Sequence, residues 1–408
     1  MSLGYDFARP HQVFTAGFFR DRDLDFATRG LLGLAASGAT EPGEVLAAVA
    51  TVKEGDPEGW FTTWRDLGLR LQQEGDALRS AGRLAGAAAA YLRASAYLST
   101  ALNAAGDDEV LGTFRAHRAA WDGFIDTTVV VADRIDIPYE GTTLPGYLLL
   151  ASEDEEPRPT IVLNNGSDAS HTELWGQAAH GALARGYNVL FFDGPGQQSM
   201  LFERGVPFRP DWEAVLTPVV DHLLASNDVL PDQLAVVGLS QAGYWVPRAL
   251  AFEHRFAAAI ADPGVVDVSA SWLPHIPAPV RAAFERGDRP AFEEDLAVGF
   301  RFDKAAARAW TFRARPYGQP SAFDTLTEVV RYRLTPDILA RITTPLYITS
   351  PEDEQFWPGQ SQQLADGVED ATVQPFTTAE GANLHVQPLA RTLTQQRMYD
   401  WLDARLGR

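Results

Sequence analysis

The chain has 408 residues, a length that predicts one large domain and a smaller accessory one. Its 34 basic and 54 acidic residues give a formal net charge of −20, so we expect neither nucleic acid nor an anionic membrane as a partner. The sequence contains no cysteine, which excludes disulfides, thiolate metal ligands and a cysteine nucleophile. No apolar segment has the length of a signal-peptide core or a bilayer span, and we therefore expect a cytoplasmic protein.

Residues 1–126 are predicted to form a helical N-terminal domain. From about 24 to 111 the sequence is rich in Ala, Leu, Arg and Glu, and apolar residues recur at spacings of three and four, as in Trp64, Leu67 and Leu71. This spacing places apolar side chains on one face of each helix. No second copy follows at a fixed period, so a repeat array is not predicted.

Residues 127–408 are predicted to form an α/β domain. Short β-branched or apolar segments at 127–131 and 143–150 flank a turn at 139–141, which indicates a hairpin. Further strands are expected at 160–163, 188–192, 234–237, 258–261, 346–349 and 372–376. They alternate with helices expected at about 174–185, 212–225, from 241, 358–364 and through 401. This alternation predicts a mainly parallel, eight-stranded type of sheet with an antiparallel edge and helices on both faces.

A helical lid insertion is predicted at about 269–337. The segment between the strands that end at 261 and begin at 346 is rich in Trp, Phe, Arg and Pro, and it is too long for a bare loop. We expect it to cover the carboxyl edge of the sheet, where open α/β sheets bind ligands.

Ser240 is the candidate nucleophile. It follows a buried strand in the segment Gly238-Leu239-Ser240-Gln241-Ala242-Gly243, and a helix is expected directly after it. Small neighbours allow a sharp strand-to-helix turn that presents the hydroxyl at the positive end of a helix. The alternative is an ordinary strand-to-helix loop.

Glu354 and His385 are the candidate acid and base. A serine, an acid and a histidine in this chain order, each after a strand, are typical of one arrangement of catalytic triad. Of the carboxylates Glu352, Asp353 and Glu354 after the strand at 346–349, we favour Glu354 because it comes last before the next helix. Asp353 is the second choice, and a solvated acidic loop is the other interpretation. Of the eight histidines, only His385 lies between the last strand and the last helix.

The backbone amides of Gln241 and of either Gly166 or Ser167 are the candidate oxyanion donors. Gln241 follows the nucleophile directly, and the loop with Gly166 and Ser167 follows the first parallel strand. A plain turn is the alternative for that loop. The turn Asp193-Gly194-Pro195-Gly196-Gln197 lacks the spacing of a phosphate-binding loop, so we predict a structural turn at the rim of the pocket.

Several aromatic residues are predicted to bind an aromatic or polyketide-like substrate. Those favoured are Tyr244, Trp245, Trp272, Trp310 and Trp357, with Phe300 and Phe302 as further members. The alternative is that many of them are simply core residues. The remaining histidines show no spacing typical of zinc ligands, and neither a metal nor another cofactor is predicted.

Four segments carry a family resemblance: Asn164-Asn165-Gly166-Ser167-Asp168, the turn at 193–197, the turn at 238–243, and Glu380-Gly381-Ala382-Asn383-Leu384-His385. The chain from about 127 to 406 resembles the α/β-hydrolase superfamily. The whole chain is similar to the subgroup that holds 2,6-dihydroxypseudooxynicotine hydrolase, the fermentation-respiration-switch-like esterases and the fungal polyketide-shortening hydrolases. The departures are Ala242 and Gln198 where Gly is common, and Glu354 where Asp is common.

The resemblance implies a helical domain packed over the active site, a homodimer, and cleavage of an ester, an amide or a β-diketone C–C bond. We therefore expect a serine hydrolase that acts on a small molecule through an acyl-enzyme. One alternative is a biosynthetic cyclase, acyltransferase or lyase that uses the same site without net hydrolysis. A second is a catalytically inactive binding module.

Overall fold

The computed structural model describes residues 16–154 and 156–408. The first 15 residues of the predicted helical domain, which are also part of the segment inspected for a signal peptide, lie outside this description. Among the described residues, no helix is both long and apolar enough to cross a membrane.

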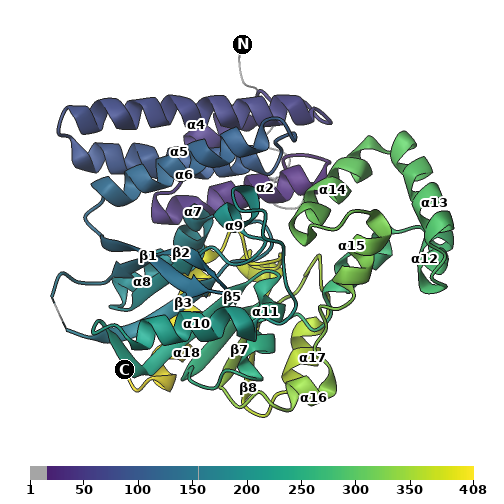
Figure 1. The fold of residues 1–408 in the computed structure, drawn as a ribbon. Helices are drawn as coiled ribbons and strands as arrows, with labels where there is room; N and C mark the ends of the chain where they lie inside the picture. Colours follow the sequence, from purple (N-terminus) through teal and green to yellow (C-terminus); the bar gives the residue numbers. More distant parts are fainter. Residues whose placement is uncertain (1–15, 155) are drawn as a thin grey trace.

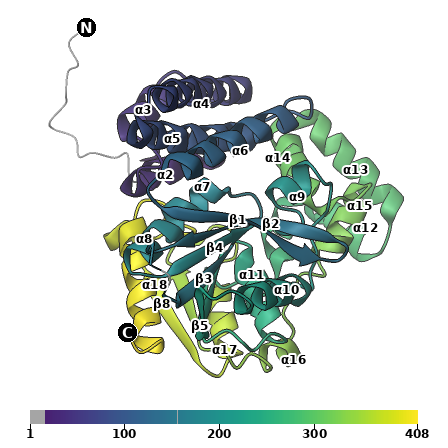
Figure 2. The same ribbon diagram turned by 60° about the vertical axis from the view of Figure 1, so that its left-hand side comes forward.

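The N-terminal part is helical, and its longest helices form one layer beside the sheet (Figures 1 and 2). Its elements are α2 (Arg22–Gly33), the 3-10 helix η1 (Leu34–Ser37), α3 (Pro42–Val49), α4 (Pro57–Ser80), α5 (Leu84–Leu102) and α6 (Val110–Thr127). The apolar faces that the sequence predicts meet between α4 and α5, where the buried rings of Trp64 and Tyr97 stack with centroids 5.5 Å apart.

A mixed sheet of eight strands forms the centre of the described chain. The strands are β1 (Val131–Tyr139), β2 (Thr142–Leu150), β3 (Arg158–Asn164), β4 (Asn188–Phe192), β5 (Val229–Leu239), β6 (Ala258–Asp262), β7 (Leu346–Pro351) and β8 (Ala371–Phe376). Their order is β1-β2-β4-β3-β5-β6-β7-β8. The β1–β2 and β2–β4 pairs are antiparallel and the other pairs are parallel, which confirms the predicted sheet and its antiparallel edge.

The predicted strand at 127–131 is wrong. Helix α6 continues to Thr127, whose hydroxyl donates to the Gly123 carbonyl at 2.6 Å within the helix. Val129 is 92% exposed, so its β-branched side chain is not part of a buried strand. Strand β1 begins only at Val131, and it meets β2 through a two-residue turn at Glu140 and Gly141, both of which have positive φ.

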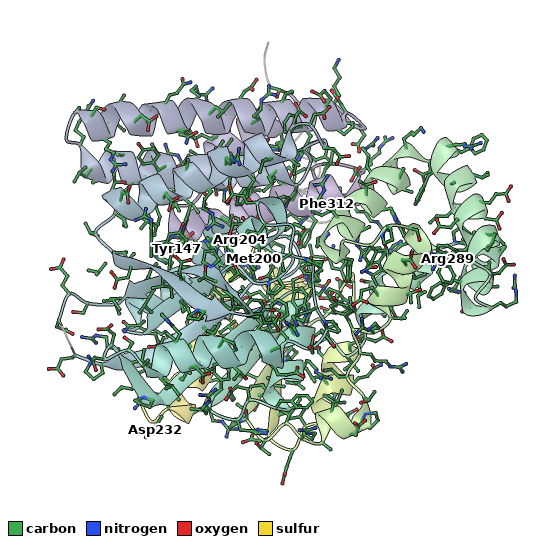
Figure 3. The ribbon with its side chains drawn as sticks, viewed as in Figure 1. Tyr147, Met200, Arg204, Asp232, Arg289 and Phe312 are labelled. Carbon is green, nitrogen blue, oxygen red and sulfur yellow. The ribbon has the colours of Figure 1, made fainter. Side chains whose placement is uncertain are left out.

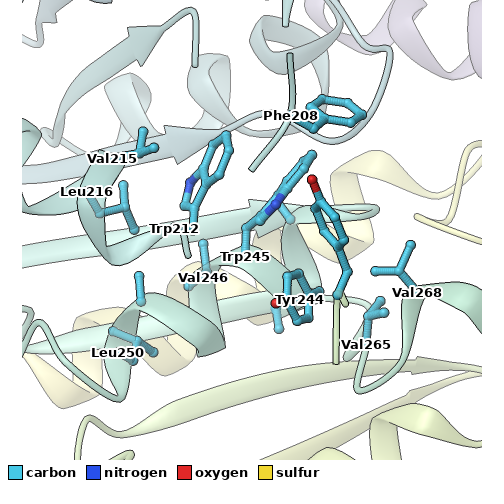
Figure 4. Close-up of a cluster of buried hydrophobic side chains, with 14 of the residues drawn as sticks. Phe208, Trp212, Val215, Leu216, Tyr244, Trp245, Val246, Leu250, Val265 and Val268 are labelled. Atoms are coloured by element: carbon cyan, nitrogen blue, oxygen red, sulfur yellow. The ribbon is translucent and has the colours of Figure 1, made fainter. Parts of the chain in front are cut away.

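Helices cover both faces of the sheet. They are α7 (His171–Leu174), the π-helix η2 (Trp175–Ala179), α8 (His180–Ala184), α9 (Gln198–Phe202), α10 (Glu213–Leu224), α11 (Ala242–Leu250), α17 (Gln360–Asp366) and α18 (Arg391–Arg405). Because side chains alternate along a strand, Val162 packs towards α10 and α11, whereas Ile161 and Leu163 pack towards α8 and α18. Figure 4 shows the first of these layers, where the rings of Trp212 and Trp245 stack 4.4 Å apart.

The segment between β6 and β7 is a helical insertion, as predicted. It contains η3 (Val268–Ser271), η4 (Leu273–His275), α12 (Ala278–Glu285), α13 (Arg289–Phe302), α14 (Lys304–Ala314), η5 (Arg315–Tyr317), α15 (Ala322–Val329) and α16 (Pro336–Leu339). In Figure 1, α12 to α15 form a separate group, drawn in green, whereas α16 lies beside α17. An ion pair of 2.9 Å between Arg315 and Asp107 joins the insertion to the N-terminal helices.

Candidate active site

Ser240 occupies the sharp turn between β5 and α11. Its φ is 56°, in the left-handed region that few residues other than glycine adopt. The Ser240 amide donates to the carbonyl of Asp262 in β6 at 2.7 Å, which ties the turn to the neighbouring strand. A strained backbone held in this way is common where a side chain must be presented for chemistry.

The turn requires glycine at 238 and 243 but not at 242. A Cβ on Gly238 would lie 2.5 Å from the Ala242 carbonyl oxygen, and a Cβ on Gly243 would lie 1.8 Å from that of Pro263. Ala242 is itself fully buried, so its methyl group is accommodated there. Alanine in place of the common glycine at 242 therefore still allows β5 and α11 to approach closely at this turn.

The structure brings Ser240, His385 and Glu354 together. His385 Nε2 lies 2.9 Å from Ser240 Oγ, and His385 Nδ1 lies 2.9 Å from each carboxylate oxygen of Glu354. The three residues follow β5, β8 and β7 respectively, whose carboxyl ends meet at one edge of the sheet.

Of the three neighbouring carboxylates, Glu354 is the one in contact with the imidazole. Glu352 instead accepts the Thr378 amide at 2.7 Å, and Asp353 accepts the Asn383 side chain at 2.6 Å. Burial would raise the pKa of Glu354, but the charge and hydrogen bond of His385, together with two backbone amides, lower that pKa below its usual value. Glu354 is therefore ionised at neutral pH and can orient the imidazole.

The turn after His385 is strained and anchored. Val386 and Gln387 have φ angles of 48° and 42°, and a β-branched residue in this region is a clear outlier. The Gln387 side chain donates to Asp262 Oδ1 at 2.9 Å, and the His385 amide donates to Gln355 Oε1 at 3.1 Å. These bonds hold the imidazole in place from both sides.

Aromatic rings surround the imidazole of His385, which is only 3% exposed. The ring centroids of Phe356, Trp357 and Phe26 lie 4.8, 5.6 and 6.2 Å from that of His385. Phe26 belongs to α2, so the helical N-terminal part covers the site directly. No sequence motif points to Phe26, because it reaches the site only through tertiary packing.

The loop after β3 approaches Ser240 closely. A Cβ on Gly166 would lie 2.8 Å from Ser240 Cβ, so only glycine fits here. The Gln197 side-chain amide donates to the carbonyls of Asn165 at 2.7 Å and Gly166 at 2.9 Å. In a trans peptide the carbonyl and the following N–H point in opposite directions, so Gln197 fixes the N–H groups of both Gly166 and Ser167. Both are candidate oxyanion donors.

The turn at 193–197 is structural, as expected, but it is buried and not at a rim. Asp193 pairs with Arg118 at 2.7 Å and with His171 at 2.9 Å, and it accepts the Ser199 amide at 3.1 Å. Burial would raise the pKa of Asp193, but Arg118 and His171 hold that pKa well below its usual range. Arg118 lies on α6, and sequence reasoning missed it because no local pattern links it to this turn.

The predicted substrate-binding aromatics lie in three different places. Tyr244 and Trp245 are fully buried core residues, and their polar atoms donate to the carbonyls of Pro210 at 3.0 Å and Arg209 at 3.1 Å (Figure 4). They have no free surface for a ligand, which favours the core interpretation for these two.

The other predicted aromatics lie outside this core layer. Trp357 flanks His385, whereas Trp272 and Trp310 pack edge to face in the insertion, with centroids 5.3 Å apart. Of the phenylalanines, Phe300 packs partly buried against Trp310 and Phe302 is 88% exposed.

In the part of the chain that the structure describes, no three His, Asp or Glu side chains are grouped in a way that could hold a metal ion.

The strand order and the strained serine turn at the carboxyl edge define an α/β-hydrolase fold. The solved structure of 2,6-dihydroxy-pseudo-oxynicotine hydrolase has this fold, with a TM-score of 0.70 at 19% identity over 91% of this chain and 94% of that one. No family model matches the chain.

Curated relatives identify the family. Hydrolase LUC6 of a Fusarium species is 31% identical over 97% of this chain and 98% of its own length. The α/β hydrolase psoB of Aspergillus fumigatus is 30% identical over 97% and 95%, and 20-hydroxy-prefusarin hydrolase FUS2 of Gibberella moniliformis is 28% identical over 97% and 98%. The chain therefore belongs to the α/β-hydrolase family, and its similarity to named hydrolases supports hydrolase function.

Proposed function

We propose that the protein is a serine hydrolase that works through an acyl-enzyme. His385 Nε2 takes the proton of the Ser240 hydroxyl, and Ser240 Oγ forms a bond to the substrate carbonyl carbon. The observation that carries this proposal is the continuous contact from Ser240 Oγ through the imidazole to Glu354, with 2.9 Å at each step. Glu354 holds the Nδ1–H tautomer and stabilises the imidazolium.

The oxyanion that forms is bound by the Gln241 amide and by one of the amides of the Gly166 loop. Gln241 is the N-cap residue of α11, whose first N–H groups lack partners within the helix and carry its positive dipole end. Donors that are already fixed need no reorganisation when charge develops. Gln197 supplies that fixation for Gly166 and Ser167.

The leaving group departs with the proton from His385 Nε2, as an alcohol, an amine or, for a β-diketone, a ketone. Water then gives a proton to His385 and attacks the acyl carbon, which releases the acid and restores Ser240. An ester, an amide and a β-diketone C–C bond are all compatible with these residues, because each leaving atom receives its proton from the same nitrogen.

The proposed substrate is a small aromatic or polyketide-like compound. The rings of Phe26, Phe356 and Trp357 beside His385 offer apolar contacts. One relative is named 20-hydroxy-prefusarin hydrolase. The homodimer and the cytoplasmic location expected from the sequence stay predictions.

A fluorophosphonate probe tests the nucleophile. We expect stoichiometric labelling of Ser240, a burst of 4-nitrophenol from 4-nitrophenyl esters, and loss of both in Ser240→Ala. Labelling that persists in Ser240→Ala, or a protein that stays unlabelled although folded by circular dichroism, would contradict the proposal.

One observation favours a biosynthetic alternative that transfers or eliminates the acyl group without net hydrolysis. The imidazole is almost fully covered by apolar rings, an arrangement that limits access of water. Turnover of the physiological substrate in H₂¹⁸O separates the two: one ¹⁸O atom in the product acid supports hydrolysis, and products without ¹⁸O support the alternative.

A further inference from the structure

Arg313, on α14 of the insertion, has N–H donors that the protein leaves unused. Its guanidinium donates to the carbonyl of Ser271 at 3.0 Å and to the Ser271 hydroxyl at 2.9 Å, and it lies 4.7 Å from the ring centroid of Trp272. A guanidinium has five N–H groups, so these two bonds leave three without a partner among the described residues. No carboxylate in the same part of the chain forms an ion pair with Arg313, and its unbonded Nε is not closed off from solvent.

A chain of side-chain contacts links Arg313 to Gln241, the residue after the candidate nucleophile. Trp272 beneath it packs against Tyr317 with centroids 5.6 Å apart, and the Tyr317 hydroxyl is 3.4 Å from the side-chain amide of Gln241. The charge of Arg313 also acts on Asp168, in the loop after β3, and Asp168 in turn interacts electrostatically with His385. Two side chains, Trp272 and Tyr317, thus connect Arg313 to Gln241, whose amide is a proposed oxyanion donor.

Acidic side chains of two other elements lie near Arg313. Asp23 of α2 and Asp168 of the loop after β3 both have exposed side chains, and the charge of each acts on that of Arg313. Phe312, labelled in Figure 3, precedes Arg313 on α14. Arg313 therefore lies where α14, α2 and the loop after β3 come close together.

We propose that Arg313 binds an anionic oxygen of the substrate, a carboxylate or the enolate of a β-dicarbonyl, at a fixed distance from the carbonyl that Ser240 attacks. This inference rests on the proposed function, because it names a substrate feature of the same site. A planar guanidinium held along one edge presents its other edge to two oxygens at once.

The contacts of Arg313 favour an anion over a cation as its ligand. Asp168, the acidic residue of the loop after β3, already accepts the Ser167 hydroxyl at 2.9 Å. Among the described residues, Arg313 donates only to neutral oxygens, and burial lowers its pKa, a cost that a bound anion relieves. The net charge of −20 repels anions from the protein as a whole, so a preference for an anionic substrate has to come from a local contact.

Esters of matched shape test this inference. The substrates are mono-4-nitrophenyl succinate, glutarate and adipate, each compared with its methyl 4-nitrophenyl diester at pH 7.5 and constant salt. At the best chain length we expect the wild type to favour the acid by about tenfold in kcat/KM, and Arg313→Gln to lower that ratio by about tenfold. Because the readout is a ratio within one variant, a general loss of fold does not imitate it.

Arg308→Gln is the matched control, since it removes an exposed arginine from the same helix. We expect it to leave the ratio within about twofold of the wild type, and Arg313→Lys to restore part of the preference. The inference is overturned if the ratio is the same in the wild type and Arg313→Gln. It is also overturned if 4-nitrophenyl 6-aminohexanoate is the preferred ester and Arg313→Gln improves its turnover.

Binding of adipate to Ser240→Ala, measured by calorimetry, separates this inference from the proposed function. We expect the added change Arg313→Gln to weaken adipate binding by about tenfold. Arg313-dependent binding without any Ser240-dependent ester cleavage contradicts the proposed function alone. Ester cleavage in which neither the ratio nor adipate binding depends on Arg313 contradicts this inference alone.

Discussion

Ser240 and Val386 have φ angles of 56° and 48°, so two of the three proposed catalytic side chains, Ser240 and His385, sit at or next to strained backbone. Such strain costs about 1–3 kcal/mol per residue and persists only when surrounding contacts hold it. Asp262 is the shared anchor: its carbonyl binds the Ser240 amide at 2.7 Å, and its carboxylate binds Gln387 at 2.9 Å. Strand β6 thereby fixes the serine and the histidine relative to one another.

Glu354→Gln is predicted to lower kcat by about 10²–10⁴-fold with little change in KM, since the imidazole loses the charge that sets its tautomer. Steady-state kinetics with a 4-nitrophenyl ester measure this. Asp353→Asn is the matched control, because that carboxylate contacts Asn383 and not His385, and we expect a change within about threefold. A larger loss in Asp353→Asn than in Glu354→Gln would assign the acid to Asp353.

The sequence identifies candidate site residues that follow strands in a characteristic chain order. It misses residues that reach the site only through packing of the N-terminal helices and the insertion. Ser240, Glu354 and His385 each follow a strand, and the fold brings strand ends together. Phe26, Arg118 and Arg313 come from helices with ordinary amphipathic patterns, and nothing in those patterns says which face meets the site. Tyr244 and Trp245 were candidates for the pocket because they adjoin Ser240, but helix α11 turns them into the core.

At the scale of elements, the turn after β4 fixes the position of the loop after β3. The turn at 193–197 follows β4, and its last residue, Gln197, bonds to the loop that follows β3. Gln197 also accepts the Gly194 amide at 3.1 Å, so its orientation is fixed on both sides. The two parallel strands place their exit loops next to each other, which makes this contact possible.

Gln197→Leu is predicted to lower kcat by about 10–100-fold, because the N–H groups of Gly166 and Ser167 lose their alignment. Binding of a boronic acid, which mimics the tetrahedral adduct, should weaken in parallel with kcat, while KM changes little. Gln362→Leu removes an exposed glutamine whose side chain, among the described residues, bonds only to Asp366, and we expect normal kinetics. Equal effects of the two changes, or a loss confined to KM, would contradict a positioning role for Gln197.

The elements themselves could largely be predicted, since hydrophobic period separates strand from helix. Strand β4 occupies residues 188–192, as the apolar pattern indicates. The pattern failed at 127–131, where β-branched residues end a helix, because tertiary packing of α6 outweighed local strand propensity. The prediction misses most of strand β1 because it rests on runs of β-branched or apolar residues, whereas the residues of β1 alternate charged and apolar, as in an edge strand.

At the scale of the whole molecule, a buried polar seam joins the N-terminal helices to the α/β part. Tyr147 of β2 donates to Asp122 of α6 at 2.7 Å (Figure 3), and Arg118 of α6 pairs with Asp193. Ser95 of α5 contacts both His117 and Thr172, at 3.0 and 2.5 Å. The helical part is thus fixed to the turns that shape the proposed oxyanion hole.

Arg118→Met is predicted to lower the free energy of unfolding by about 3–5 kcal/mol, since it leaves the Asp193 carboxylate buried without its main partner. Urea unfolding measures this. Arg115→Met is the matched control on the same helix: its pair with Glu203 is exposed, and we expect a loss of at most about 1 kcal/mol. In the double variant with Asp193→Asn, part of the loss should be recovered. Equal losses of unfolding free energy in Arg115→Met and Arg118→Met would show that the buried ion pair stabilises the fold no more than the exposed one does.

The seam also makes stability depend on pH through His117. Burial, with a smaller contribution from Arg118, lowers the pKa of His117 to about 3 from an ordinary value of 6.5. The folded protein therefore holds this imidazole neutral while the unfolded chain binds a proton below pH 6.5, so stability falls as pH decreases from 6.5 towards 3. The slope from this residue approaches about 1.4 kcal/mol per pH unit.

His117→Gln cannot take up a proton, so its loss of stability over that range should be smaller than that of the wild type. The quantity to measure is the difference in unfolding free energy between the two proteins at pH 7, 6 and 5, which we expect to shift in favour of the variant as pH falls. His254→Gln changes an exposed histidine and serves as the control, with a constant difference from the wild type. A pH-independent difference for His117→Gln would mean that the imidazole becomes protonated without unfolding, and that the seam opens to water while the fold persists.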